Sequence, residues 1–251
     1  MDSLEIFPAP AEMSEAAVRL FSARAEQAVS QRGRFTAALS GGKTPVELYT
    51  LLAKTPLASR IPWARVHLFW ADERCVPPDH QDSNYRMVRE LILDHVPIPP
   101  ANVHRMQGEM DPVEAAARYE EGMRQFFAAS RGPFPVFDLV LLGLGADGHT
   151  ASLFPGTRAI RESARWVLGH YVDAQKGWRI TLTPPAINAA RTVAFVVAGA
   201  GKAPVLRDIL EGPFRPDVLP AQIVRPEGGD LLWMLDRDAA SLLKGKGELQ
   251  P

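Results

Sequence analysis

Short runs of apolar residues recur along the chain, separated by longer stretches in which apolar and polar residues alternate at helical spacing. The short runs are too brief for ordinary helices, and strands buried on both faces of a sheet have this composition. They predict strands at 35–39, 66–70, 138–142, 166–172, 179–183, 192–198 and 230–235. About 34 residues then precede the first strand.

The stretches with helical spacing predict helices between these strands. Residues 11–32 place Val18, Phe21, Ala25 and Val29 near helical spacing, with Glu, Arg and Gln among them. Further helices are predicted from Pro45 onward and at 83–95, 111–128, 184–190, 203–211 and 237–244.

Two of these helix starts carry capping residues. Thr44 fits the N-cap of one helix, with Pro45 at the first helical position and Glu47 at the third. Segment 111–114, Asp-Pro-Val-Glu, repeats the pattern. Both starts can therefore be placed closely.

The alternation of strands and helices predicts the fold class. It implies right-handed βαβ crossovers and a mostly parallel sheet with helices on both faces. We expect one three-layer αβα, Rossmann-like α/β domain over residues 1–251, because no repeat, low-complexity segment or linker interrupts the pattern.

Composition and charge narrow the classes of partner. With 46% hydrophobic and 23% charged residues, the chain has the composition of an ordinary soluble globular protein. Its net charge is -1, and no run of Lys and Arg exceeds two residues, so we expect no nucleic-acid partner. No apolar stretch is long enough for a membrane span, and no membrane partner is expected.

Cysteine and histidine usage point to a cytoplasmic protein without a metal. The single Cys75 excludes an intramolecular disulfide, and residues 1–10 lack the basic start and apolar core of a signal peptide. The six histidines show no metal-ligand spacing. A cytoplasmic location and no metal are therefore expected.

Segment 137–157, FDLVLLGLGADGHTASLFPGT, combines a buried strand with a glycine-rich turn. Gly143, Gly145 and Gly148 permit backbone conformations and close approaches that a Cβ would forbid. Asp147 and His149 add a carboxylate and an imidazole two residues apart. Histidine titrates near neutral pH, so this turn is a candidate for acid-base chemistry.

A second small-residue turn, Ser40-Gly41-Gly42-Lys43-Thr44, leads into the helix that begins at Pro45. Unpaired backbone N–H groups at a helix start favour an anion such as phosphate, although plain tight turns have the same composition. Segment 72–74, Asp-Glu-Arg, also follows a strand, and three consecutive charges are typical of a solvated loop.

The topology should bring these segments together. Segments 40–44, 72–74, 143–149 and 199–202 each follow a predicted buried strand, and parallel strands end at one edge of a sheet. Around one crevice there, Arg74 and Lys202 would supply positive charge for a phosphate, and His149 would be free to move protons. No GxSxG motif is present, which favours attack by water or proton transfer over covalent catalysis.

Four motifs resemble those of the 6-phosphogluconolactonase family: SGGKTP at 40–45, DERCV at 72–76 with DSN at 82–84, GLGADGHTASLFPG at 143–156, and RITLT at 179–183. The third is the most specific, whereas SGGxTP is shared with glucosamine-6-phosphate deaminases (isomerases). The resemblance implies hydrolysis of 6-phospho-D-glucono-1,5-lactone to 6-phosphogluconate in the pentose phosphate pathway, without a cofactor. The expected partner is this small-molecule sugar-phosphate lactone, and the expected assembly is a monomer or a weak homo-oligomer.

The resemblance also implies roles for individual residues. Segment 40–44 would cradle the phosphate, with Arg74 and Lys202 supplying charge, and Arg179 would contact either the substrate or only the sheet edge. His149 would be the general acid-base, and Asp147 would orient its imidazole. We further expect the backbone N–H groups of Gly143, Gly145 and Gly148 to hold the developing oxyanion.

Two other functions stay open at this point. An amino-sugar-phosphate isomerase or deaminase of the same fold would carry an AFNEP-like continuation after the Asp-Gly-His sequence, where this chain has ASLFPG at 151–156. A sugar-phosphate sensor that binds without catalysis would need a DNA-binding unit, and the residues before the first predicted strand are too few for one.

Overall fold

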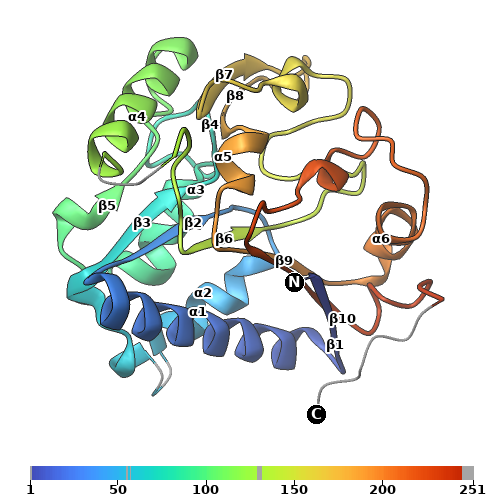
Figure 1. The fold of residues 1–251 in the computed structure, drawn as a ribbon, viewed down its shortest axis with the longest axis horizontal. Coiled ribbons are helices and arrows are strands. Elements are labelled where there is room, and N and C mark those ends of the chain that lie inside the picture. Colours follow the sequence, from blue (N-terminus) through green and yellow to red (C-terminus); the bar gives the residue numbers. More distant parts are fainter. Residues whose placement is uncertain (1, 55, 57, 129–131, 245–251) are drawn as a thin grey trace.

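Seven parallel strands form the central sheet in the computed structural model, which describes residues 2–54, 56, 58–128 and 132–244. Their order across the sheet is β1-β10-β9-β6-β2-β3-β5 (Figure 1). The strands are β1 (Asp2–Phe7), β2 (Phe35–Leu39), β3 (Val66–Trp70), β5 (Val103–His104), β6 (Leu139–Leu142), β9 (Thr192–Val197) and β10 (Asp230–Asp236). The sequence prediction of a mostly parallel α/β sheet is confirmed.

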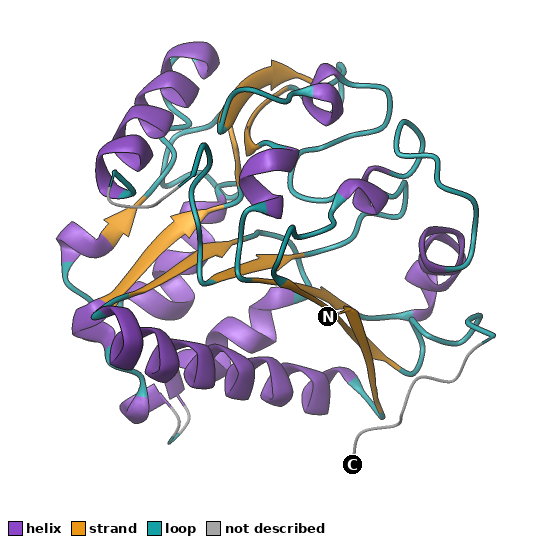
Figure 2. Cartoon of the chain, in the orientation of Figure 1, coloured by secondary structure: helices purple, strands orange, loops and turns teal. Residues whose placement is uncertain are grey.

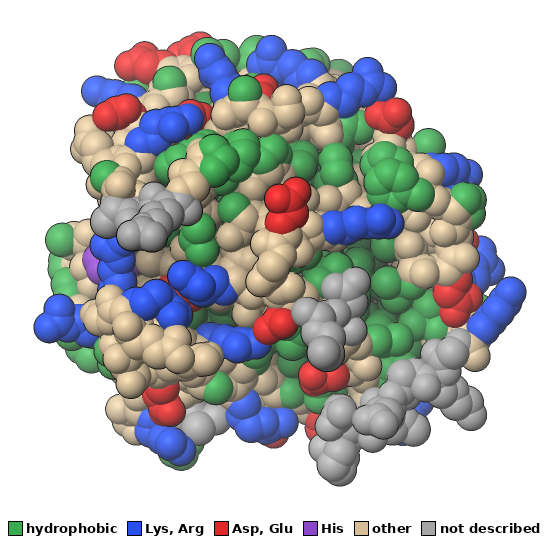
Figure 3. All heavy atoms as spheres, in the orientation of Figure 1, with side chains coloured by type: hydrophobic (Ala, Val, Ile, Leu, Met, Phe, Trp, Pro, Cys, Tyr) green, Lys and Arg blue, Asp and Glu red, His purple; other side chains and the backbone are tan. Residues whose placement is uncertain are grey.

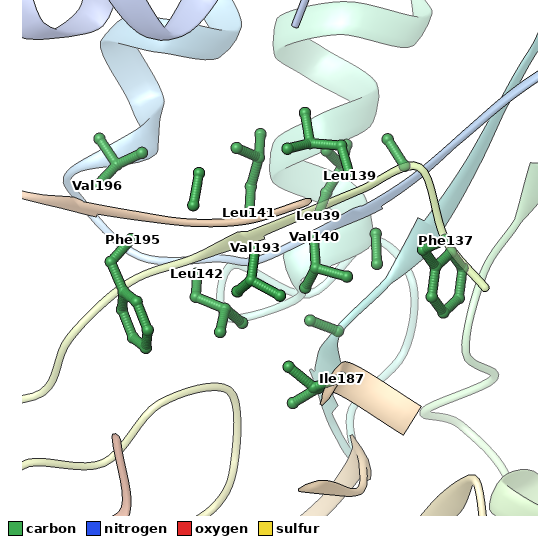
Figure 4. Close-up of a cluster of buried hydrophobic side chains, with 14 of the residues drawn as sticks. Leu39, Phe137, Leu139, Val140, Leu141, Leu142, Ile187, Val193, Phe195 and Val196 are labelled. Atoms are coloured by element: carbon green, nitrogen blue, oxygen red, sulfur yellow. The ribbon is translucent and has the colours of Figure 1, made fainter. Parts of the chain in front are cut away.

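The middle of this sheet is apolar on both faces. Every residue of β2, β6 and β9 is buried, as the continuous apolar runs predict. Figure 4 shows Leu139 and Leu141 on one face of β6 and Val140 and Leu142 on the other. The strands at the centre are therefore fixed by packing on both sides, which gives the loops at their ends a rigid base.

Helices flank the sheet (Figure 2). They are α1 (Pro10–Arg32), α2 (Pro45–Lys54), α3 (Asn84–Val88), α4 (Pro112–Phe126), α5 (Pro184–Asn188) and α6 (Ala203–Leu210). Helix α1 packs on α2 and on β1, β2 and β10, whereas α4 packs on a second, smaller sheet. The predicted helix 83–95 is divided, because α3 continues into a π-helical turn, Arg89–Leu93. Across the described helices, none combines the length and the apolar character needed to span a bilayer.

The smaller sheet is antiparallel, with the order β4-β8-β7. Its strands are β4 (Asp72–Arg74), β7 (Val167–Tyr171) and β8 (Trp178–Leu182). Two of the predicted strands thus lie outside the parallel sheet, because a short turn joins them as a hairpin. The interpretation of 72–74 as a solvated loop is wrong: Asp72 and Glu73 are buried in β4.

The predicted helix starts are confirmed at Pro45 and Pro112. Asp111 caps α4 by accepting hydrogen bonds from two backbone N–H groups of the first turn. At α2, the Glu47 carboxylate accepts a hydrogen bond from the Ser14 hydroxyl at 3.2 Å and so joins α2 to α1.

Both ends of the described chain differ from the prediction. Strand β1 precedes the first predicted strand and pairs with β10 along its whole length. The predicted helix 237–244 is a series of turns, because the Asp236 side chain accepts the Ala239 N–H and also binds the Gly199 N–H. These bonds hold the segment against the loop after β9 instead of starting a helix.

Charged side chains are mixed on the surface. On the face shown in Figure 3, Lys and Arg side chains lie around the rim and in a small group at the left of the view, with Asp and Glu side chains scattered among them. Any concentration of positive charge on this nearly neutral chain is therefore local, and one such concentration occurs at the edge of the central sheet.

Candidate active site

Four loops meet at the carboxyl edge of the central sheet, as the sequence predicts. Strands β9, β6, β2 and β3 are parallel neighbours, so the segments that follow them emerge together. They surround a cavity of about 420 Å³. All the predicted site residues except Asp147 and Gly148 line it: Ser40, Gly41, Gly42, Lys43, Thr44, Arg74, Gly143, Gly145, His149, Arg179 and Lys202.

Asp147 lies behind the cavity lining and binds the ring of His149. The Nδ1 of His149 is hydrogen-bonded to Oδ1 of Asp147, and the ring stacks on Phe154 with 4.1 Å between centroids. Partial burial raises the pKa of Asp147, but the hydrogen bond and charge of His149 together lower it more, to about 2. Asp147 is therefore ionised at neutral pH, and its bond to Nδ1 leaves Nε2 for another partner.

Glycine is required at two positions of this turn. A Cβ on Gly145 would lie 2.0 Å from His149 Nδ1 and 2.6 Å from Asp147 Oδ1, so a side chain there would push the pair apart. Gly148 has φ +81, and a Cβ there would meet Leu219. Gly143 differs from the prediction, since a Cβ on it would meet nothing within 4 Å.

Gly145 and Gly148 do not provide the oxyanion donors that the sequence predicts. The N–H of Gly145 donates to the carbonyl oxygen of His149, and the N–H of Gly148 donates to that of Gly145. These hydrogen bonds close the turn that positions His149. The two N–H groups are therefore not free to bind a developing oxyanion.

The turn before α2 presents backbone to the cavity. The Ser40 hydroxyl donates to the carbonyl oxygen of Leu141 at 2.8 Å, and the Ser40 carbonyl accepts the Tyr49 hydroxyl. The Ser40 side chain thus ties β2 to β6. Residues 41–44 line the cavity at the start of a ten-residue helix, where the helix dipole favours an anion.

Two arginines stand opposite each other across the smaller sheet. Arg74 of β4 pairs in register with Arg179 of β8, and both line the cavity. Arg74 donates to the Asp82 carbonyl at 2.6 Å, and Arg179 donates to the carbonyls of Lys176 and Trp178. Burial lowers the pKa of Arg179, and the charge of Arg74 lowers it further. Like charges directly opposite on paired strands are destabilising, so the arrangement points to an anion between them.

Lys202 completes the positive charge of the cavity from the turn Ala200–Lys202, which follows β9. We call Lys43, Arg74, Arg179 and Lys202 the cavity cations. Across residues 2–54, 56, 58–128 and 132–244, none of the four forms an ion pair with a carboxylate. Their charge is available to a ligand.

Known proteins are similar to this chain in sequence and fold. A family model described as glucosamine-6-phosphate isomerases/6-phosphogluconolactonase matches residues 8–233. The chain belongs to this family. A Synechocystis sp. protein named 6-phosphogluconolactonase is 46% identical over 231 residues, covering 92% of this chain and 93% of that protein. A Nostoc sp. protein of the same name is 42% identical over 242 residues, covering 96% and 98%. The structure of 6-phosphogluconolactonase from Trypanosoma cruzi superposes with a TM-score of 0.85 at 32% identity, covering 98% of each chain.

Three polar residues without a role in the sequence prediction also line the cavity of this family member. Asp72, nearly buried, accepts the Ser152 hydroxyl at 2.7 Å and the Asn84 side-chain amide at 3.3 Å. Ser152 lies within the glycine-rich motif and Asn84 within the DSN motif, and this position was the feature of the sequence that could have indicated them as site residues. Their hydrogen bonds join three separate segments below the cavity.

The neighbouring carboxylate, Glu73, fixes the start of α3. It accepts the backbone N–H groups of Arg74, Asn84 and Tyr85. Burial nevertheless raises its pKa to about 6. Glu73 therefore holds the segment that carries Arg74 and Asn84 and does not itself line the cavity.

The other histidines pack elsewhere. His67 and His104 lie within 3.2 Å of each other between Nδ1 and Nε2, beside Phe126. His170 is buried in β7 and hydrogen-bonds the Ser152 carbonyl. In the part of the chain that the structure describes, no three His, Cys, Asp or Glu side chains are grouped to hold a metal ion.

Proposed function

We propose that the chain is a 6-phosphogluconolactonase that opens 6-phospho-D-glucono-1,5-lactone to 6-phospho-D-gluconate, a step of the pentose phosphate pathway, with His149 as general acid-base. The observation that carries the proposal is the cavity itself, which joins the imidazole bound by Asp147 to four cations that form no ion pair with a carboxylate among the described residues. A phosphorylated lactone fits a cavity with these two ends. Its phosphate is dianionic, and its uncharged ring carries an electrophilic carbonyl.

The phosphate would lie between the start of α2 and the two arginines. Residues 41–44 line the cavity at the positive end of the helix dipole, where their backbone N–H groups would bind the phosphate. Arg74 and Arg179 approach from the smaller sheet and Lys202 from the loop after β9. A phosphate carries about -1.5 to -2 charges at pH 7, which would offset the repulsion between the paired arginines.

The lactone carbonyl would then lie near His149. Because the Nδ1 proton is directed to Asp147, Nε2 of the neutral ring can take a proton from water as the water oxygen bonds to C1. The tetrahedral intermediate collapses with cleavage of the bond between C1 and the ring oxygen. His149 returns the proton to that oxygen, and the product acid ionises to the carboxylate.

The developing oxyanion needs donors other than Gly145 and Gly148. Lys43 is the cavity cation that is not placed against the phosphate, and its ammonium would supply N–H groups and positive charge to stabilise the intermediate. Asp147 keeps the imidazole in one tautomer and stabilises the imidazolium that forms during the reaction.

The test is hydrolysis of phosphorylated and unphosphorylated glucono-1,5-lactone side by side, corrected for spontaneous opening. We expect kcat/KM to be far higher for the phosphorylated lactone and turnover to depend on His149. Equal rates on both lactones would remove the phosphate site from the proposal. Binding of the phosphorylated product without any hydrolysis would favour the sugar-phosphate sensor.

Assay with glucosamine 6-phosphate addresses the remaining alternative. In this chain, segment 151–156 adds an aromatic ring, Phe154, against His149 and no carboxylate. The deaminases of this fold carry a further carboxylate there, so we expect no release of ammonia. Deamination at a rate comparable to lactone hydrolysis would contradict the proposed function.

A further inference from the structure

The hairpin that joins β7 and β8 has a tightly fixed turn beside the imidazole. The Asp173 carboxylate accepts the backbone N–H groups of Gln175 and Lys176 at 2.9 and 2.7 Å. The Gly177 N–H donates to the Asp173 carbonyl, and the Val172 N–H donates to the Gly177 carbonyl. These bonds set the direction in which the Lys176 side chain leaves the turn.

The Lys176 ammonium lies near three groups, two of which contact His149. Its Nζ lies 3.1 Å from Asp173 Oδ2 and 3.9 Å from Asp147 Oδ2. It also lies 4.9 Å from the centroid of the Phe154 ring, and that ring stacks on the imidazole. One ammonium thus reaches both the carboxylate that binds His149 and the aromatic ring against which His149 rests.

We propose that Lys176 is a positioning residue for the lactonase reaction: it fixes the Asp147 carboxylate and the Phe154 ring, and its charge opposes protonation of His149. This inference rests on the proposed function of His149. Lys176 lies outside the four motifs that resemble the family and carried no role in the sequence prediction.

The two oxygens of Asp147 explain the effect. Oδ1 binds the imidazole, whereas Oδ2 faces the ammonium. A cation at Oδ2 offsets part of the carboxylate's negative charge, so the carboxylate stabilises an imidazolium less. His149 must be neutral to accept a proton from water. Lys176 would therefore keep His149 in its working form to a lower pH.

Other charged groups lie around the cavity that contains His149. The cavity cations line it from the smaller sheet and from the loops after β2 and β9, and Asp72 lines it as well. Segment 215–221 packs on Gly148 and carries Asp217, whose carboxylate is paired with Arg161. Lys176 differs from all of these because its ammonium lies within 4 Å of the carboxylate that binds the ring.

The test compares Lys176→Met with Lys176→Arg, which keeps the charge, and with Lys54→Met, which removes an exposed lysine at the end of α2. The backbone carbonyl of Lys176 that accepts from Arg179 is kept in all three. Two quantities are measured against pH: kcat for the phosphorylated lactone, and the ring resonances of His149, assigned by their loss in His149→Ala.

In Lys176→Met we expect the acidic limb of kcat and the His149 titration to move together to higher pH, by about half a unit, as removal of a partly exposed charge pair allows. Below the midpoint of that limb, kcat should fall about threefold, with little change in KM. Lys176→Arg should restore most of the wild-type profile, and Lys54→Met should match wild type.

Unchanged titration of His149 in Lys176→Met would overturn the inference, as would an equal loss of kcat at every pH or a profile that Lys176→Arg does not restore. If the wild-type protein lacks lactonase activity, the proposed function fails. The resonances of His149 still decide whether Lys176 acts on the imidazole.

Discussion

The two ends of the cavity balance their charges differently. At the imidazole end, His149, Asp147, Lys176 and Asp173 form a series in which each charged group contacts one of opposite sign. At the opposite end, the cavity cations form no ion pair with a carboxylate within the described residues, and two of them face each other across paired strands.

The fold alone balances the charges at the imidazole end, whereas the charges at the cationic end are balanced only when an anionic substrate binds. The imidazole end is organised without a ligand, because its groups satisfy one another. The cationic end carries a repulsion that an anion would remove. Changes at the imidazole end should therefore lower kcat, whereas changes at the cationic end should raise KM.

The largest effect is expected from His149→Ala. Loss of a general acid-base typically lowers kcat by 10² to 10⁴-fold, and KM should change little because the phosphate site is intact. Blank-corrected lactone hydrolysis measures both quantities. His95→Ala is the matched control, since His95 is exposed and its ring hydrogen-bonds the Glu90 carbonyl away from the cavity. Wild-type turnover in His149→Ala would show that the imidazole end has another role.

Gly145→Ala tests the same end without removing a chemical group. The added Cβ would lie 2.0 Å from His149 Nδ1, so the imidazole must move. A displacement of about 1 Å can cost roughly 10²-fold in rate, and we expect a loss of that order in kcat. Gly122→Ala in α4 is the control, because a Cβ there meets nothing within 4 Å. Equal kinetics in the two variants would contradict the tight packing of this turn.

At the cationic end, Arg179→Ala should raise KM for the phosphorylated lactone roughly 10 to 100-fold, since a charge-assisted hydrogen bond contributes about 1.5–3 kcal/mol. KM for the unphosphorylated lactone and kcat should change much less. Arg118→Ala, which removes an exposed arginine of α4, serves as the control.

Arg179→Ala should not destabilise the ligand-free protein, although truncations of side chains usually do. Because the variant removes one of two like charges that face each other, its thermal midpoint should equal or exceed that of wild type. Inorganic phosphate should raise that midpoint more in wild type than in Arg179→Ala. If KM were unchanged and phosphate raised the midpoint of Arg179→Ala as much as that of wild type, Arg179 would not bind the phosphate and would serve only the structure of the smaller sheet.

Glu73 should have the smallest effect on turnover and a distinct effect on stability. Its folded-state pKa of about 6 lies above the ordinary value of 4.5, so the folded chain keeps a proton that the unfolded chain releases. The free energy of unfolding should therefore fall as pH rises from about 4.5 to 6, by an amount on the order of 2 kcal/mol.

Glu73→Gln does not titrate and should lack this dependence. Urea unfolding of both proteins from pH 4.5 to 7 measures it, and the difference between them isolates Glu73 from the other carboxylates. If the gap in unfolding free energy between wild type and Glu73→Gln stayed constant across this range, the pKa of Glu73 would not be raised in the folded chain.

The centre of the fold and the meeting of the four loops could be predicted from the same feature of the sequence, its short apolar runs. Short apolar runs such as 35–39 and 192–198 are too brief for ordinary helices and are typical of strands buried on both faces, and parallel strands end at one edge. Segment 2–7 was missed because Leu4, Ile6 and Phe7 alternate only briefly with polar residues, a pattern that loops also show.

The parts of the site that depend on long-range pairing could not be predicted. Arg74 meets Arg179 only because β4 and β8 pair as antiparallel strands, and no local signal sets that register. Likewise, the capture of the Gly145 and Gly148 N–H groups inside their turn follows from backbone geometry that residue types do not specify. The roles of Asp72 and Lys176 emerge only from the same tertiary contacts.

The pairing of β1 with β10 links the beginning of the described chain to its end, and this has a consequence for folding. As the chain emerges from the ribosome, β1 is made before its hydrogen-bonding partner β10, which follows about 220 residues later. Until then, β1 lacks the strand with which it pairs along its whole length. Closure of this sheet edge is therefore a late event of high contact order, and a chain interrupted before β10 would expose an unpaired strand to aggregation.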